Sequence, residues 1–368
     1  MLSEAPPSIR AFIRFFLLPY CFFKLIDWQK CNKPKFSVVN DLLTLFFKYK
    51  AFPDHYSPCR LWEKNRAEWA YYYGSGYNPY QRYKFRETVQ PFKIKKFLQN
   101  KLKCEEYFKA KGIPMPITYG IISPGENCEE IIKDLFTSIP CDKLIIKPLF
   151  GKSGRGVALA VKTLNGIVFK RRGIINSVKS FSVAEPSIIQ EVIIQHESIS
   201  QYSPFSVNTI RTVPFLTRDN SVIMLSACMR FSVGDSVVDN WSAGGIAVGV
   251  NCVKGILMEF AFDKNGNMHS YHPISSKIFC GFKIPFWDQI YELTKKTQLA
   301  SPDCRLIGLD IAVTPQGPVV IEINPEPDLI LQEQTSGPLL KDPIILKEFA
   351  RYNLLYNSQQ TKLLNIRF

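Results

Sequence analysis

Residues 306–324 form the stretch LIGLDIAVTPQGPVVIEIN, which predicts two apolar strands joined by the three-residue loop PQG. If the strands pair symmetrically about Gln316, Asp310 lies opposite Glu322. Asn324 follows two residues after Glu322 and therefore shares its face of the sheet. Two carboxylates on one face of an apolar hairpin repel each other unless a cation lies between them, and hard oxygen donors suit Mg²⁺ that also contacts substrate phosphates. The hairpin therefore predicts a metal site of Asp310, Glu322 and Asn324; the alternative is an edge hairpin with its polar residues in water.

A second pattern lies earlier in the chain. Residues 143–149, KLIIKPL, predict a strand that contains Lys147, and residues 157–162 predict another. The segment between them matches neither the GxxxxGK[ST] phosphate loop nor the GxGxxG dinucleotide turn. We expect it to join two antiparallel strands and to fold over nucleotide phosphates as a lid, the alternative being a purely structural turn. Its phosphate-binding candidates are Gly151, Lys152, Ser153, Gly154, Arg155 and Gly156.

Between and before these patterns the chain alternates helix and strand signals. Residues 100–111 predict a short amphipathic helix that Gly112 ends. Residues 117–122 predict a strand, and residues 129–136 predict a helix. The expected fold class is therefore α+β.

A strand lysine before a glycine-rich hairpin, followed by a carboxylate–carboxylate–amide hairpin, resembles the ATP-grasp fold over residues 100–340. The resemblance is closest to the sugar-transfer-associated ATP-grasp branch, which is related to the glutamate ligases. It rests on IQE at residues 189–191, SVNTIRT at 206–212, DNWSAGG at 239–245 and EIN at 322–324. It implies two α+β lobes that clasp ATP between their sheets.

The resemblance also implies roles for single residues. Lys101 and Lys147 contact phosphates, while Arg211, Asn208 and Lys147 act in catalysis, with Arg211 stabilising the charge of the transition state. The implied nucleotide contacts in the hinge strand and after it are Gln190, Glu191, Val192, Ile193 and His196. The implied substrate contacts are Asp239, Asn240, Gly244, Gly245, Asp328 and Gln332. Simpler alternatives are a surface cation for Arg211, a structural histidine for His196 and a plain turn for Gly244 and Gly245; His269 and His272 are expected at the surface.

The reaction implied by the resemblance is an ATP- and Mg²⁺-dependent ligation. ATP phosphorylates a carboxylate, and a small-molecule amine or amino acid attacks the acyl phosphate to form an amide. The implied acceptor is an anionic, uronic-acid-type sugar or glycan in bacterial capsule or O-antigen synthesis. The expected location is the cytoplasm, or peripherally the inner face of the membrane. The alternatives are a phosphotransferase acting on a sugar hydroxyl and a non-catalytic nucleotide- or glycan-binding protein; nucleic-acid binding is disfavoured because no recognised module accompanies the basic aromatic run.

The chain is predicted to divide into four parts. These are a helical, aromatic and basic N-terminal extension (1–99), a linker helix with a small lid lobe (100–190), a large lobe with the metal hairpin (191–345) and a C-terminal helix or tail (346–368). The basic charge lies mostly in the first part: residues 1–103 contain 19 basic and 7 acidic residues, a net of +12, out of +14 for the 368 residues. We expect the N-terminal part to recruit something large and anionic.

Two features of the N-terminal part leave alternatives open. The apolar residues 15–23 are too few to span a membrane, so they predict either an interfacial helix or a helix packed on the core. Aromatic and basic residues alternate over residues 60–86, which fits either ligand stacking or tyrosine packing. The ten cysteines include no CxxC pair and are expected to be reduced thiols.

Overall fold

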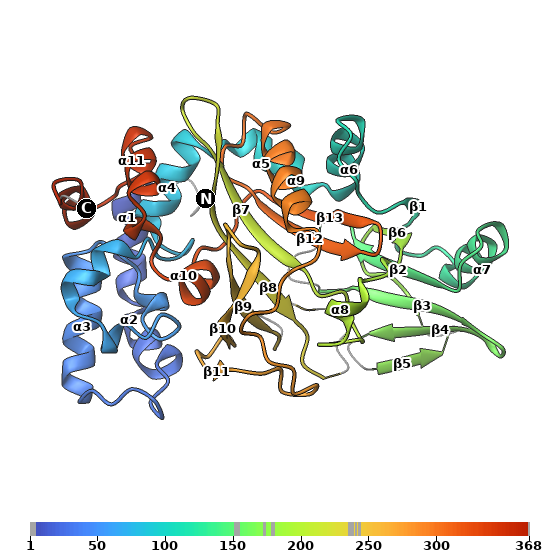
Figure 1. Ribbon diagram of the computed structural model, residues 1–368, viewed down its shortest axis with the longest axis horizontal. Coiled ribbons are helices and arrows are strands. Elements are labelled where there is room, and N and C mark those ends of the chain that lie inside the picture. The colour runs from blue at the N-terminus through green and yellow to red at the C-terminus, as the bar shows by residue number, and fades with distance from the viewer. Residues whose placement is uncertain are drawn as a thin grey trace.

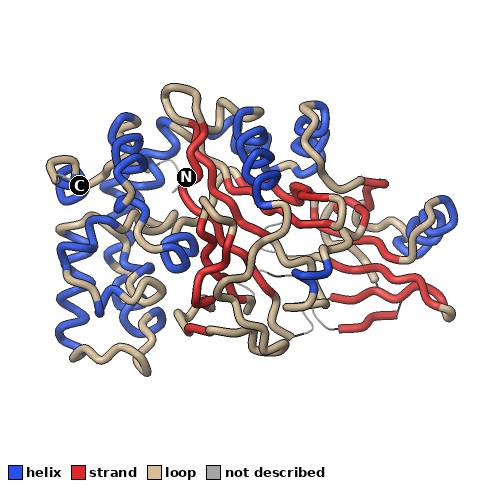
Figure 2. The backbone as a smooth tube through the Cα atoms, viewed as in Figure 1, coloured by secondary structure: helices blue, strands red, loops and turns tan. Residues whose placement is uncertain are grey.

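The computed structural model describes residues 5–150, 155–171, 174–177, 181–234, 239, 241 and 244–366. A helical N-terminal part is followed by two sheets, and the second sheet lies between the helices and the first sheet (Figures 1 and 2). Every pairing between described strands is antiparallel. The α+β prediction is confirmed.

The first sheet has six described strands in the order β1-β6-β2-β3-β4-β5. Its strands are β1 (Thr118–Ile122), β2 (Lys143–Pro148), β3 (Ala158–Thr163), β4 (Gly166–Arg171), β5 (Ile174–Ser177) and β6 (Ser187–Glu191). Helix α7 (Cys128–Ser138) packs on it through Ile132 and Phe136, which are buried with Leu144 and Ile146 of β2. Strands β2 and β3 pair antiparallel on either side of the glycine-rich segment, as predicted.

The second sheet has seven described strands in the order β11-β10-β9-β8-β7-β12-β13. Its strands are β7 (Ile210–Leu216), β8 (Val222–Phe231), β9 (Ile246–Asn251), β10 (Ile256–Phe262), β11 (Met268–His269), β12 (Gly308–Thr314) and β13 (Gly317–Asn324). Helix α9 (Trp287–Leu299) buries Trp287, Ile290 and Leu293 in the same core as the central strands. His272, expected at the surface, is instead 1% exposed, and its Nε2 lies 2.9 Å from the Ser232 carbonyl.

In the hairpin of β12 and β13, Asp310 lies opposite Glu322, as predicted. The strands near the loop, however, do not pair symmetrically about Gln316. Thr314 pairs with Gly317, so the tip is a two-residue loop, and the pairing is offset by one residue from Gln316. A bulge at Ile321 then inserts one residue in β13 and restores the Asp310–Glu322 pair. The prediction was right about the facing carboxylates and wrong about the three-residue loop.

The N-terminal part is helical, as predicted. Its elements are α1 (Pro7–Phe15), α2 (Leu18–Tyr20), the π-helix η1 (Cys21–Leu25), α3 (Lys35–Phe47), the 3₁₀ turns η2 (Pro53–His55), η3 (Leu61–Glu63) and η4 (Arg66–Tyr71), α4 (Pro79–Thr88), α5 (Phe92–Gln99) and α6 (Lys101–Ala110). Most of the alternating aromatics are core residues, because Trp62, Trp69 and Tyr73 are at most 4% exposed. Tyrosine packing is therefore the better explanation for that part of the run. The structure shows all ten cysteines as free thiols, and among the described residues no helix is long and apolar enough to cross a membrane.

The C-terminal elements fasten the N-terminal part to the second sheet. They are α10 (Ile330–Ser336), η7 (Leu339–Lys341), α11 (Pro343–Arg351) and α12 (Ser358–Leu363). The remaining short helix, α8 (Glu197–Ser200), lies earlier in the chain, just before the second sheet. Phe349 of α11 packs edge-on against Tyr73 at 4.9 Å between ring centroids, and it also contacts Phe215 of β7. The N-terminal helices, the C-terminal helices and one side of the second sheet thus share one core.

Glu333 of α10 holds this junction through three backbone groups. Its Oε1 accepts from the Tyr73 and Leu339 N–H groups at 2.6 and 3.2 Å, and its Oε2 accepts from the Gly74 N–H at 3.0 Å. Burial raises the pKa of Glu333 to about 7, although these hydrogen bonds oppose the shift. The folded protein therefore keeps a proton on Glu333 over a pH range in which the unfolded chain has lost it.

We expect Glu333→Gln to change how stability depends on pH. Between the ordinary carboxyl pKa and about 7, the native free energy of unfolding falls as pH rises, because the folded state binds the extra proton. The substituted glutamine cannot titrate, so in this variant the free energy of unfolding loses that dependence on pH. The amide also has only one oxygen that can accept hydrogen bonds, where the carboxyl group has two. Urea unfolding at about pH 5 and about pH 7.5 measures both effects. The matched control is Glu259→Gln at an exposed position on β10. If the native protein and both variants showed the same change in stability between the two pH values, Glu333 would not be its source.

Candidate functional site

A cleft of about 390 Å³ lies where the two sheets face each other and the N-terminal part borders them. Strand β2 contributes Lys147, strand β13 contributes Glu322 and Asn324, and helix α6 begins at Lys101 beside them. Next to it lies a smaller cavity of about 160 Å³ that shares Lys147, Asp310 and Glu322 with the cleft. The structure therefore brings together residues that the sequence predicted from segments far apart in the chain.

The predicted hinge residues line the smaller cavity. Gln190, Glu191, Val192 and Ile193 follow one another along its wall, and the apolar side chains of Ile145, Val157 and Ile321 also border it. Glu191 Oε1 accepts from the Ile117 N–H at 2.8 Å, which fixes the end of β6 against β1. An apolar slot with exposed backbone at a strand end suits a flat heterocycle with a hydrogen-bonding edge.

Two lysines lie at the junction of the two cavities. The Lys101 ammonium is 3.6 Å from Glu322 Oε1, and Lys147 Nζ is 3.5 Å from the Ile321 carbonyl. Burial lowers the pKa of Lys147, while the charge of Glu322 acts in the opposite direction. Lys147 is half-buried and lines both cavities, so its ammonium is well placed for an anionic ligand such as a phosphate.

The oxygen donors predicted for a metal lie on the cleft side of the hairpin. The Glu322 side chain is 41% exposed, and Asn324 Oδ1 accepts from the Glu326 N–H at 2.9 Å. Asp310 is already bound to arginines, so only its remaining lone pairs are free. Among the described residues, no three His, Cys, Asp or Glu side chains cluster to hold a metal ion. The donors nevertheless fit Mg²⁺, because a carboxylate and an amide oxygen suit this ion when substrate phosphates and water complete its shell.

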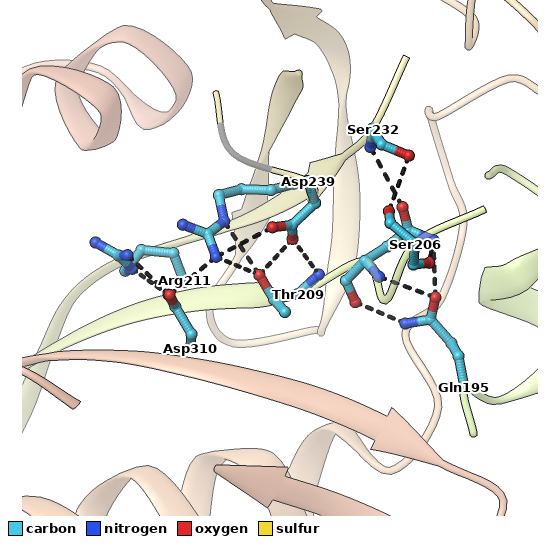
Figure 3. Close-up of polar contacts among 9 residues, drawn as sticks. Gln195, Ser206, Thr209, Arg211, Ser232, Asp239 and Asp310 are labelled. Carbon is cyan, nitrogen blue, oxygen red and sulfur yellow. Dashed lines mark hydrogen bonds and ion pairs between the residues drawn. The ribbon is translucent and has the colours of Figure 1, made fainter. Parts of the chain in front are cut away.

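Two arginines and two aspartates form a buried network on the wall of the cleft (Figure 3). Arg211 of β7 pairs with Asp310 across the strands and donates from Nη2 to its Oδ2 at 3.0 Å. Arg230 of β8 lies 3.0 Å from the same Oδ2 and 3.5 Å from Asp239. Asp239 also accepts from the Thr209 N–H at 2.7 Å.

The charges in this network are mutually compensated. Burial would raise the pKa of Asp310, but the charges of Arg211 and Arg230 outweigh burial and lower it to about 2. Burial likewise raises the pKa of Asp239, with Arg230 opposing. Asp310 is therefore ionised at neutral pH and holds Arg211 against the cleft wall. Gly308 makes room for this arrangement, because a Cβ there would lie 2.9 Å from Pro327 and 3.6 Å from the Arg211 chain.

Three predicted site residues lie outside the linings of the cleft and the smaller cavity. Asn208 is fully buried and bonds Gln195 and the Ser203 carbonyl. His196 caps α8 by accepting from the Ser198 N–H. Gln332 is also fully buried and accepts from the Ser226 hydroxyl at 2.6 Å. These three residues make hydrogen bonds within the protein and do not line either cavity.

The remaining predicted residues divide into three groups. Asp239 lines the smaller cavity and Asp328 lines the cleft. The described Arg155, Gly156, Gly244 and Gly245 line neither. The others, Gly151, Lys152, Ser153, Gly154 and Asn240, lie outside the described residues.

Sequence reasoning missed several residues that line the cleft. Arg230 lies near the end of the apolar strand β8, and a charged residue inside an apolar strand is the same signal that identified Lys147. Arg82, Tyr77 and Trp241 also line the cleft. Arg82 and Tyr77 come from the extension that the sequence placed outside the catalytic fold, so part of that extension borders the cleft. Arg82 lies 3.3 Å from Glu326, which Lys95 also contacts at 2.7 Å.

Several solved structures are similar to this chain at low sequence identity. Similar solved structures include the ADP complex of purK, an N5-carboxyaminoimidazole ribonucleotide synthetase (9% identity, TM-score 0.37, covering 63% of this chain and 46% of that chain). A second is the D-cycloserine synthetase DcsG (12% identity, TM-score 0.42, covering 72% of this chain and 73% of that chain). A third is the VanG D-Ala:D-Ser ligase from Enterococcus faecalis (12% identity, TM-score 0.40, covering 73% of this chain and 62% of that chain). The chain thus spans less than half the length of the first of these. No curated protein sequence matches it.

The family comparison is more specific. Residues 80–343 match the family model described as sugar-transfer associated ATP-grasp, which covers well over half of the chain. This match places the chain in the ATP-grasp class of proteins. Within that class, the chain belongs to the sugar-transfer associated ATP-grasp family.

Proposed function

We propose that the protein joins a carboxylate to an amine at the expense of ATP, through an acyl phosphate. One observation chiefly supports this: Lys101, Lys147, Glu322 and Asn324, from different elements, border one cleft beside an apolar slot. Phosphoryl transfer to a carboxylate needs little covalent help from the protein, because the main tasks are to neutralise charge and to align the partners. The cleft has cations and oxygen donors for both tasks.

On the nucleotide side, we assign the adenine to the slot at Gln190–Ile193 and the phosphates to Lys101 and Lys147. Gly151 to Gly156 remain the proposed lid over the phosphates. Glu322 and Asn324, with the free lone pairs of Asp310, are the proposed holders of Mg²⁺. When bound, that ion supplies charge neutralisation at the phosphates. Asp239 would border the nucleotide rather than the acceptor, since it lines the smaller cavity.

On the acceptor side, we assign Arg211 to the transferred phosphoryl group and the acyl oxygen. Its guanidinium is held in place by Asp310, so little ordering is needed when charge develops. Asp328 borders the same cleft, and its side chain is exposed to it although protein surrounds the site. Burial raises the pKa of Asp328. We assign it to the amine: its carboxylate can hold an ammonium and accept the proton that the amine loses before attack.

Our proposal for the biological substrate is based on the family, whose description refers to sugar transfer. We propose an amino acid or other small amine as one partner and a uronic-acid-type sugar, in bacterial surface polysaccharide synthesis, as the other. The enzyme would act in the cytoplasm, at or near the inner face of the membrane. The four-part division of the chain remains a proposal, amended by the contribution of Arg82 and Tyr77 to the cleft.

Amine-dependent ADP release tests the reaction class. With uronic acids, amino acids, ATP and Mg²⁺, we expect ADP to form only when both a carboxylate and an amine are present. Glu322→Ala should lower this rate by at least about a hundredfold, because it removes a charged group from the phosphate site. ADP release with a sugar alone, accompanied by a phosphorylated sugar, would instead identify a phosphotransferase.

A further inference from the structure

Two N-terminal helices expose an unusually large apolar surface. On α3, the exposed apolar residues recur at helical spacing along one side, and α1 has a similar row near its end. We name this surface the phenylalanine face; it consists of Phe12, Phe15, Phe16, Phe36, Val39, Leu43 and Phe47. Phe36 is 84% exposed, and Phe12, Phe16 and Phe47 are each 64–65% exposed. A single exposed phenylalanine is ordinary, but a group of this size indicates a contact surface.

The side chains of the two helices form one continuous patch. The Phe15 ring lies 5.8 Å from Phe46 and 5.9 Å from Phe47, measured between centroids. Phe12 and Phe16 meet edge to face at 5.2 Å, and Phe16 also contacts Phe15. The end of α1 therefore continues the row of α3.

This surface is additional to the internal packing of α3. Val38, Leu42 and Leu45 on the other side of the helix are at most 3% exposed and belong to the core shared with the C-terminal helices. The helix is therefore apolar on both sides. Its solvent side does not need phenylalanine for folding, so the exposed row requires another explanation.

The charge around the phenylalanine face is positive. Residues 1–50 contain eight basic residues and three acidic ones. Two of the acidic residues form ion pairs within the N-terminal part: Asp27 pairs with Lys30, and the buried Asp41 pairs with Lys33 and Arg66.

Three exposed lysines belong to the same N-terminal part as the phenylalanine face. Lys24, Lys35 and Lys48 are exposed, and none takes part in an ion pair between described residues. Lys35 begins α3 and Lys48 follows its last residue, so a cation lies at each end of the row. Phenylalanines next to lysines match the interface of a bilayer that carries anionic headgroups.

From these observations we infer that the phenylalanine face docks the protein on an anionic phospholipid surface. A second copy of the chain is a poorer occupant, because a two-fold contact would bring the same lysines together. Helix α3 lies at the end of the molecule away from strands β3, β4 and β5 (Figure 1). The inference does not depend on the ligase chemistry.

Vesicle flotation with the full-length protein tests this inference. We expect binding to phosphatidylcholine vesicles that contain phosphatidylglycerol, and much weaker binding to phosphatidylcholine alone. Phe36→Ser with Phe47→Ser should lower the partition coefficient by at least about tenfold, as should Phe12→Ser with Phe16→Ser. Replacing Lys24, Lys35 and Lys48 by Gln should lower it by about tenfold or more and abolish the preference for phosphatidylglycerol.

The matched control is Ile274→Ser with Ile278→Ser, which removes two side chains that are 59% and 67% exposed outside the face. This variant should bind vesicles like the native protein. All substitutions are at exposed positions, so thermal unfolding should be unchanged and ATP binding retained. Failure of the native protein to float with anionic vesicles would overturn the inference, as would equal losses in the face and control variants. A native dimer that Phe36→Ser with Phe47→Ser dissociates would assign the face to a second copy instead.

Discussion

Replacing Lys147 by Met is expected to lower the affinity for ATP by at least about tenfold, which is the scale of a lost hydrogen bond to a charged group. Lys147 lines both cavities, and it is a half-buried cation whose pKa is lowered by desolvation. Methionine keeps most of the volume and removes the charge. The loss should therefore appear in nucleotide binding, measured by calorimetry with ATP and Mg²⁺, and not in stability.

The chain offers a closely matched control for this experiment. Lys143 lies four residues earlier on the same strand and on the same face, but it is exposed at the outer end of β2. Lys143→Met should bind ATP like the native protein. If both variants bound ATP equally well, the nucleotide would not lie between the sheets as we describe.

Replacing Arg230 by Met is expected to have the largest effect on stability, a loss of about 3–5 kcal/mol in the free energy of unfolding. Arg230 is buried and is the only one of the two arginines in the network that contacts both Asp239 and Asp310. Without it, the buried carboxylate of Asp239 loses its compensating cation and, within the part of the chain that the structure describes, keeps hydrogen bonds to the Thr209 groups. Urea unfolding at neutral pH measures the loss.

Adding Asp239→Asn should recover part of this loss, because it removes the unpaired buried charge. The comparison is Lys295→Met at the surface, where the ion pair with the exposed Glu292 contributes little to stability. Equal losses in the Arg230 and Lys295 variants would show that the buried charges of the network do not depend on Arg230 for compensation.

The sequence allowed the hairpin and its carboxylates to be predicted because strand alternation fixes which residues share a face. It did not reveal the bulge at Ile321, since a bulge leaves no mark on an apolar run. The predicted pairing of Asp310 with Glu322 survived only because the shorter tip and the bulge compensate each other. Lys147 was found for a sounder reason, since a lysine within a buried strand needs an anionic partner.

Other parts of the site depend on contacts that sequence spacing does not encode. Asn208 and Gln332 have the residue types of a binding site, yet both point into hydrogen-bonded interior positions. Arg82 reaches the cleft because Glu333 binds the backbone of Tyr73 and Gly74, more than 250 residues earlier in the chain. Such long-range contacts explain why the N-terminal part was predicted to lie apart from the chemistry.

The acyl-phosphate step is tested most directly by following oxygen from the carboxylate. The protein is incubated with ATP, Mg²⁺, an amine and a uronic acid labelled with ¹⁸O in its carboxyl group, and the released phosphate is analysed by mass spectrometry. Attack of the carboxylate on ATP, followed by displacement by the amine, leaves one labelled oxygen in the inorganic phosphate. We predict this transfer, together with an amide that retains the other labelled oxygen. Release of unlabelled phosphate, or phosphate that remains esterified to the sugar, would contradict the proposed reaction.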